Sequence, residues 1–163
     1  SDSVVSLPKQ QLYLIDITNR TLAKIKEGDN DAKVKLNWIK ASKELCSSET
    51  FDAYGIKSDF IGYVTNIYAY DDGSIGIKIM LSHLGKLDRQ FEVIQENVDE
   101  SLYETILELN EGGTFSAGDK VKFSGYFKKG KISQNECLDA GMDADPEFEG
   151  ETFNFKFTKI EKI

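Results

Sequence analysis

The chain has 163 residues, of which 40% are hydrophobic and 29% are charged, and it contains ten Phe, seven Tyr and only two Pro. This composition excludes an intrinsically disordered chain, a collagen-like chain and a small disulfide scaffold, and the length suits one domain with a small addition. The net charge of −8 argues against non-specific binding to polyanions.

The N-terminal part of the chain predicts two helices. Apolar residues recur at near-helical spacing over Leu12–Ile25, directly after Pro8, which suits the first turn of a helix. A stretch rich in stop and cap residues separates this helix from a second one, expected over Asp31–Cys46. The apolar side of the second helix is expected to hold Ala32, Leu36, Ile39 and Leu45. We therefore expect a helical extension over residues 1–55.

From Phe60 the period of the apolar residues changes to two, which is typical of β-strands. A long β-branched and aromatic run over 60–70 ends at Asp71–Ser74, a turn in which glycine accepts a positive φ angle. A second strand is expected from Ile75 to Ser82. Further strands are expected at Gln90–Gln95, at Lys120–Phe127 and around Phe153–Phe157.

A short helix is expected between the third and fourth strands. Ser101 and Glu104 have the spacing of a capping box, and the helix that they open would run through Leu109. Five strands with a short helix between the third and the fourth is the order of an OB-fold barrel. The sequence therefore predicts a mainly β chain of the α+β class, with a five-stranded OB-fold barrel over residues 56–163 behind the N-terminal helical extension.

Three segments of the barrel half combine turns with core strands. They are Phe60–Val64 with its Asp-Gly turn, Gly118–Gly125, and Asp145–Phe148 followed by Phe153–Phe157. Through these segments the chain resembles the tRNA-anticodon-like OB-fold domains of uncharacterised bacterial proteins. Some of those proteins look like envelope proteins with a lipoprotein or membrane anchor, so the resemblance implies a periplasmic or envelope-anchored protein, with a cytoplasmic one as the alternative. Because the shared segments are structural, they imply the fold more strongly than the ligand.

The sequence gives no pattern for catalysis. His83 is the only histidine, no Gly-x-Ser-x-Gly elbow precedes a helix, and no glycine loop has the spacing that binds phosphates. We expect a protein that is not an enzyme, with no catalytic residue, metal ligand or cofactor. The acidic stretch over residues 136–151 is interpreted as a solvated loop, and calcium binding stays open, although Phe148 stands where an EF-hand loop has glycine.

The two cysteines, Cys46 and Cys137, lie too far apart in sequence for a zinc motif. They leave two interpretations open, either two buried thiols or a single disulfide that ties the N-terminal segment to the barrel. A disulfide would place the protein in the cell envelope.

OB barrels commonly bind ligands across strands two and three, between the loops that follow strands one and four. The candidate ligand-binding residues are Lys128, Lys129, Lys131, Tyr126, Arg89 and Phe91. Because residues 51–163 carry a net charge of −9, the leading expectation is a non-catalytic binding module for a protein or a saccharide. Flat contact surface for such a partner is available from Tyr63, Tyr68, Tyr70 and Tyr126. Single-stranded nucleic-acid binding through the lysine-rich hairpin is the alternative.

Overall fold

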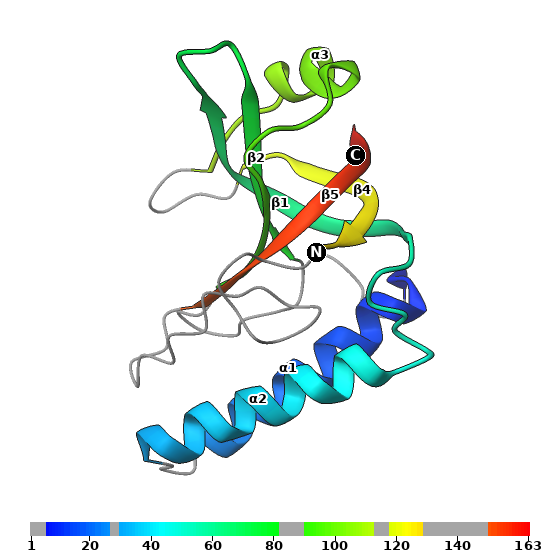
Figure 1. Cartoon of the computed structure of the whole chain (residues 1–163). Coiled ribbons are helices and arrows are strands. Elements are labelled where there is room, and N and C mark those ends of the chain that lie inside the picture. The colour runs from blue at the N-terminus through cyan, green and yellow to red at the C-terminus, as the bar shows by residue number, and fades with distance from the viewer. Residues whose placement is uncertain (1–5, 27–29, 82–89, 113–117, 129–149) are drawn as a thin grey trace.

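The computed structural model describes residues 6–26, 30–81, 90–112, 118–128 and 150–163 (Figure 1). Its first elements are the helices α1 (Lys9–Lys26) and α2 (Asp31–Ser47). The described strands are β1 (Lys57–Ala69), β2 (Ile75–Leu81), β3 (Gln90–Gln95), β4 (Lys120–Phe127) and β5 (Gly150–Lys162). Between β3 and β4 lie a 3₁₀ turn (Glu100–Leu102) and the helix α3 (Tyr103–Leu107).

The five strands form a closed barrel in the order β1–β2–β3–β5–β4, and β4 pairs with β1 to close it (Figure 1). All neighbouring strands are antiparallel except β3 and β5, which are parallel. A small five-stranded mixed barrel of this kind is OB-fold-like. The predicted fold class is therefore confirmed.

Strand β1 serves two neighbours, because its first half pairs with β4 and its second half with β2. Its register with β2 shifts between Val64 and Asn66, and such a bulge lets a strand bend around a barrel. Just before the bulge, a Cβ added to Gly62 would lie 2.4 Å from the carbonyl oxygen of Met80. The two strands thus approach each other closely at this glycine, as its position inside a strand predicts.

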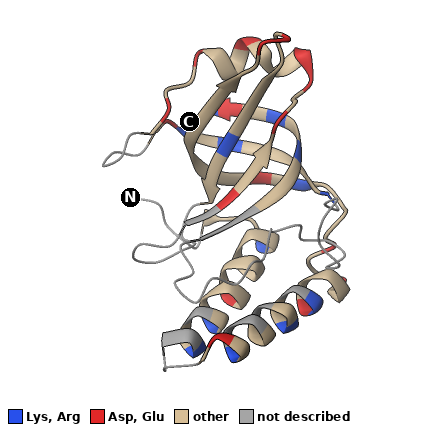
Figure 2. Ribbon diagram, turned by 60° about the vertical axis from the view of Figure 1, so that its left-hand side comes forward, with Lys and Arg blue, Asp and Glu red and all other residues tan. Residues whose placement is uncertain are grey.

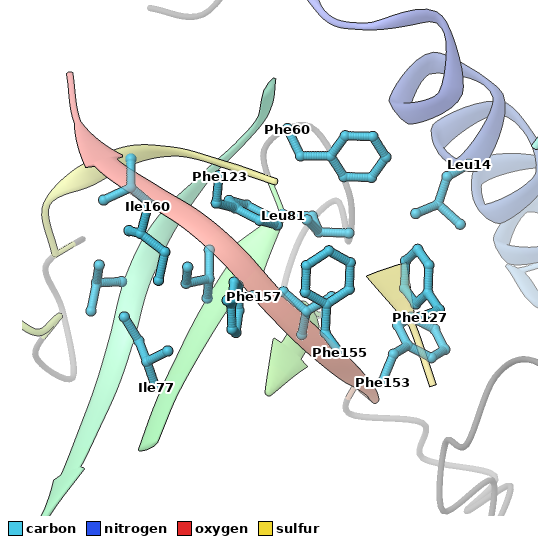
Figure 3. Close-up of a cluster of buried hydrophobic side chains, with 14 of the residues drawn as sticks. Leu14, Phe60, Ile77, Leu81, Phe123, Phe127, Phe153, Phe155, Phe157 and Ile160 are labelled. Carbon is cyan, nitrogen blue, oxygen red and sulfur yellow. The ribbon is translucent and has the colours of Figure 1, made fainter. Parts of the chain in front are cut away.

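Phenylalanine rings from the neighbouring strands β4 and β5 fill the interior of the barrel (Figure 3). The ring of Phe123 meets those of Phe155 and Phe157 edge-on, with centroids 5.6 and 5.5 Å apart. Phe127 meets Phe155 in the same way at 5.2 Å. Burial of one such side chain contributes roughly 1.5–3 kcal/mol. The alternating phenylalanines seen in the sequence therefore form the core of the barrel.

The segment between β3 and β4 lies at one end of the barrel (Figure 1), and its side chains Leu102, Ile106 and Leu109 are buried. The predicted capping box is wrong, because Ser101 lies within the 3₁₀ turn and does not cap it. The turn shifts the start of α3, so that its N-cap position falls on Leu102, which makes no side-chain cap bond.

Helix α1 packs against the opposite end of the barrel (Figure 1). Gln11 is fully buried, and its Nε2 donates to the carbonyl oxygen of Ile61 while its Oε1 accepts from the Ile61 N–H, both at 2.9 Å. Leu14 lies beside Phe60 and Phe127 at this end of the core (Figure 3). A helical side chain therefore completes the hydrogen bonding of β1 just before its pairing with β2 begins at Gly62.

Helix α2 begins where the sequence predicts, with the side chain of Asn30 accepting the N–H of Lys33 at 3.0 Å. Its predicted apolar side is wrong in part. Ala32 is exposed and Leu36 is 64% exposed, whereas Ala41 and Leu45 are buried. The contact with α1 determines which side of α2 is buried. This side includes the small residue Ala41, which the spacing of large apolar residues does not indicate.

The loop between α2 and β1 is fastened by a buried lysine. Lys57 is fully buried, and its Nζ donates to the carbonyl oxygens of Asp52 and of Gly55, the latter at 2.8 Å. The same nitrogen lies 5.0 Å from the ring centroid of Phe51, which is itself buried between rings of α1 and β4. Burial lowers the pKa of Lys57 to about 8, against the opposing influence of the Asp52 carboxylate. This ammonium therefore joins the helical extension to the start of the barrel.

Candidate functional site

The hairpin between β1 and β2 presents two parallel tyrosine rings. Tyr68 and Tyr70 lie two residues apart on one side of the strand end, with ring centroids 6.3 Å apart and planes inclined by 22°. Across from Tyr68 on β2 stands Gly76, which has no side chain to cover the ring. Tyr70 is 41% exposed. We call these two residues the tyrosine surface.

The turn that carries the tyrosine surface is held by hydrogen bonds. The carboxylate of Asp72 accepts from the backbone N–H of Ser74 at 2.9 Å and from its hydroxyl at 2.6 Å, and these bonds lower the pKa of Asp72. Gly73 has a φ angle of 85°, and its N–H donates to the Tyr70 carbonyl oxygen at 2.9 Å. The predicted Asp-Gly turn is confirmed, and it orders the backbone next to Tyr70.

The surroundings of the tyrosine surface are negatively charged. Desolvation raises the pKa of Tyr70, and the nearby Glu96 carboxylate and Tyr68 hydroxyl raise it further. The exposed acidic residues Asp71 and Asp72 lie in the adjoining turn. Tyr70 therefore stays a neutral hydrogen-bond donor near neutral pH, within an environment that favours neutral or positively charged partners.

Polar groups continue along the outer side of β1 toward β3. The hydroxyl of Thr65, at the bulge, donates to the Glu92 carboxylate at 2.8 Å. Farther along β1, the backbone N–H of Ile67 donates to the Glu111 carboxylate at 3.0 Å. These bonds fix both carboxylates against the barrel, Glu92 from strand β3 and Glu111 from the segment that precedes β4.

A second surface lies on the outer side of β4 and β5. Because alternate residues of these strands face inward, five lysines share their outward side. They are Lys120, Lys122, Lys128, Lys156 and Lys159. We call this set the lysine face. Figure 2 shows positive and negative residues along the barrel strands, with further negative residues at the loops above them.

The structure brings two of the six predicted ligand-binding residues together. Lys128 is exposed directly after β4, and Tyr126 is half-buried across from Lys156, so both belong to the outer side of β4 and β5. Phe91 lies in strand β3, which pairs with the edge of β5 opposite to β4. The side chain of Phe91 is not among the described side chains. The remaining three predicted residues, Arg89, Lys129 and Lys131, also lie outside the described residues.

Sequence reasoning missed the lysine face as a whole. The alternation of Lys120 and Lys122 with buried residues is visible in the sequence, and so is that of Lys156. What the sequence does not show is that β4 and β5 pair, which places lysines some thirty residues apart on one surface.

A cleft of about 230 Å³ lies between α1 and α2. Arg20 lines it, with its guanidinium bound to Asp16 at 3.1 Å and to Glu44 at 3.3 Å. The bound guanidinium is thus already neutralised by carboxylates of the protein.

Several other predictions from the sequence concern residues that lie wholly or partly outside the described ranges. Cys46 is disulfide-bonded, and Cys137, the only other cysteine of the sequence, lies outside the described residues, as do His83 and residues 136–149 of the acidic stretch. Within the described residues, no group of three or more His, Cys, Asp or Glu side chains could hold a metal ion. No helix in the described ranges is long and apolar enough to cross a membrane.

Comparisons of the sequence with protein families and with curated proteins identify no related protein. No protein-family model matches the chain, and a search of curated proteins finds no match. The functional argument therefore depends on the surfaces described above.

Proposed function

We propose that this chain is a non-catalytic binding module whose tyrosine surface contacts a neutral or positively charged partner, either a saccharide or a protein segment. The observation that carries the proposal is the stacked, partly exposed pair of Tyr68 and Tyr70 at the end of β1. Tyrosine rings offer rigid apolar area together with a hydroxyl, and they bind partners at low cost in conformational entropy.

The position of the pair supports the same proposal. The loop between the first two strands and the outer side of strands two and three form the usual ligand-binding region of OB-fold barrels, which accept oligosaccharides as well as oligonucleotides. Negative charge from Asp71, Asp72 and Glu96 disfavours a phosphate-rich ligand here and favours a sugar or a Lys- or Arg-bearing segment.

The proposed location is an oxidising compartment such as the bacterial envelope. The disulfide at Cys46 supports it, because disulfides persist outside the reducing cytosol. We propose Cys137, the only other cysteine, as its partner.

Single-stranded nucleic acid remains the second candidate ligand, and the observation that favours it is Tyr126 beside Lys128 and Lys156. Such ligands are held by several stacking aromatics in a basic groove. On β4 and β5, Tyr126 is the one outward-facing aromatic side chain among the described residues, so this candidate ranks below the first.

The proposed function is tested by calorimetric titration of the chain with a neutral glucose oligosaccharide and with a Lys- and Arg-rich peptide. We expect one of the two probes to bind. We further expect the double variant Tyr68→Ala, Tyr70→Ala to weaken that binding by about tenfold to 100-fold, as for central interface tyrosines.

The matched control is Tyr54→Ala, which removes a tyrosine that is 47% exposed but lies in the loop after α2. It should leave the affinity unchanged. Equal losses in the control and in the double variant, or no binding of either probe, would contradict the assignment of the tyrosine surface.

A further inference from the structure

The lysine face has a chemistry different from that of the tyrosine surface. Of the charged residues with described side chains on the outward side of β4 and β5, five are lysines and one is an acid, Glu161, across from Lys122. We propose that the lysine face is a docking surface for the anionic headgroups of a lipid bilayer. The proposal is independent of the ligand assigned to the tyrosine surface.

Three of the lysines have free charges. Lys122, Lys128 and Lys159 form no ion pair with any residue in the described ranges. Lys156, by contrast, binds the Asp99 carboxylate at 2.7 Å. The free ammonium groups are spread along both strands, so they present positive charge over an area and not at a single point.

The net charge of the chain does not cancel this local field. At physiological ionic strength, exposed charges more than about 8 Å apart are largely screened from each other. Among the described residues, the acids beside these lysines are Glu161, Asp99, which binds Lys156, and, next to Ser124 on the neighbouring β1, Asp59. A negatively charged surface that approaches from this side therefore meets mainly lysines.

The residue types favour a membrane over a polynucleotide. Every cation of the face is a lysine, and neither β4 nor β5 contains arginine, the residue that binds individual phosphates with a rigid pair of hydrogen bonds. Lysines near a bilayer act as separate point charges, each contributing to adsorption on anionic lipid. The half-buried Tyr126 among them has the amphipathic character of residues found at membrane interfaces.

The test is flotation of the full chain with vesicles of phosphatidylcholine containing phosphatidylglycerol, compared with vesicles of phosphatidylcholine alone. We expect binding to the anionic vesicles only, and its loss at high salt. The triple variant Lys122→Gln, Lys128→Gln, Lys159→Gln should lower the apparent partition coefficient by about 100-fold, because each lysine near the surface accounts for roughly a fivefold effect.

The matched control is Lys33→Gln, Lys40→Gln, Lys43→Gln, which removes the same charge from exposed positions of α2. It should change the partition coefficient by less than about threefold, and thermal unfolding shows whether both variants are folded. Equal losses in the two triple variants, or equal flotation with neutral vesicles, would overturn the proposal. Lysine-dependent binding of a single-stranded oligonucleotide without vesicle binding would also overturn it and assign the face to nucleic acid.

Discussion

Replacement of Gln11 by Leu tests whether the helical extension is an integral part of the barrel. The side chain of Gln11 is fully buried, and its two hydrogen bonds satisfy the N–H and the carbonyl oxygen of Ile61 at 2.9 Å each. Leu has a similar volume but no polar atom, so both backbone groups of Ile61 lose their partner. One buried unsatisfied group costs about 1–3 kcal/mol, and the pair predicts a loss of roughly 3–4 kcal/mol in the free energy of unfolding.

Urea unfolding followed by circular dichroism measures this loss. The matched control is Gln10→Leu, which removes one hydrogen bond, from Nε2 to the Phe51 carbonyl oxygen at 3.0 Å, and should cost about 1 kcal/mol. A loss below about 1 kcal/mol for Gln11→Leu would refute the reasoning, because the Ile61 groups would then be satisfied without the helix.

Three further predictions concern the loop lysine, the bend of β1 and the disulfide. Burial lowers the pKa of Lys57 to about 8 from an ordinary 10.5, so the unfolded chain binds more protons than the folded chain between these pH values. The unfolding free energy of the wild type, relative to that of Lys57→Met, should therefore rise by about 3 kcal/mol from pH 8 to pH 10.5. A difference that does not change with pH in urea unfolding would contradict this prediction. Gly62→Ala places a Cβ against the Met80 carbonyl oxygen and should lower the unfolding free energy by about 2 kcal/mol or more, whereas Gly73→Ala, in open space but at positive φ, should cost about 1 kcal/mol; equal effects would argue against the close approach. Reduction should raise the intact mass by two hydrogen atoms if Cys46 and Cys137 are bonded as proposed, and two free thiols in material never exposed to reductant would refute the pairing.

The strands could be predicted because local chemistry and tertiary packing agree in them. In Lys120–Phe127, every second residue is apolar, and the structure buries those residues together with Gly125. The Asp-Gly turn was equally readable, since Gly73 adopts the positive φ angle that the pattern requires. Both features depend on neighbours in sequence, which is the information that a single sequence contains.

Features that depend on distant contacts could not be predicted in this way. Nothing near Lys57 in sequence indicates that backbone carbonyl oxygens of the preceding loop will satisfy its buried ammonium. The buried side of α2 follows from its contact with α1, so Leu36 is exposed although it is strongly apolar. The sequence shows that Tyr68 and Tyr70 offer aromatic contact area. Their stacking and their acidic surroundings become visible only in the folded hairpin.

The most direct test of the central claim, that the chain binds partners through the tyrosine surface, is amide NMR of the full chain titrated with the glucose oligosaccharide and the basic peptide. We predict shift changes concentrated at Tyr68, Tyr70 and the turn through Ser74, extending to Glu96 at the end of β3. Changes centred on the helices α1 and α2, with the hairpin unaffected, would contradict the account.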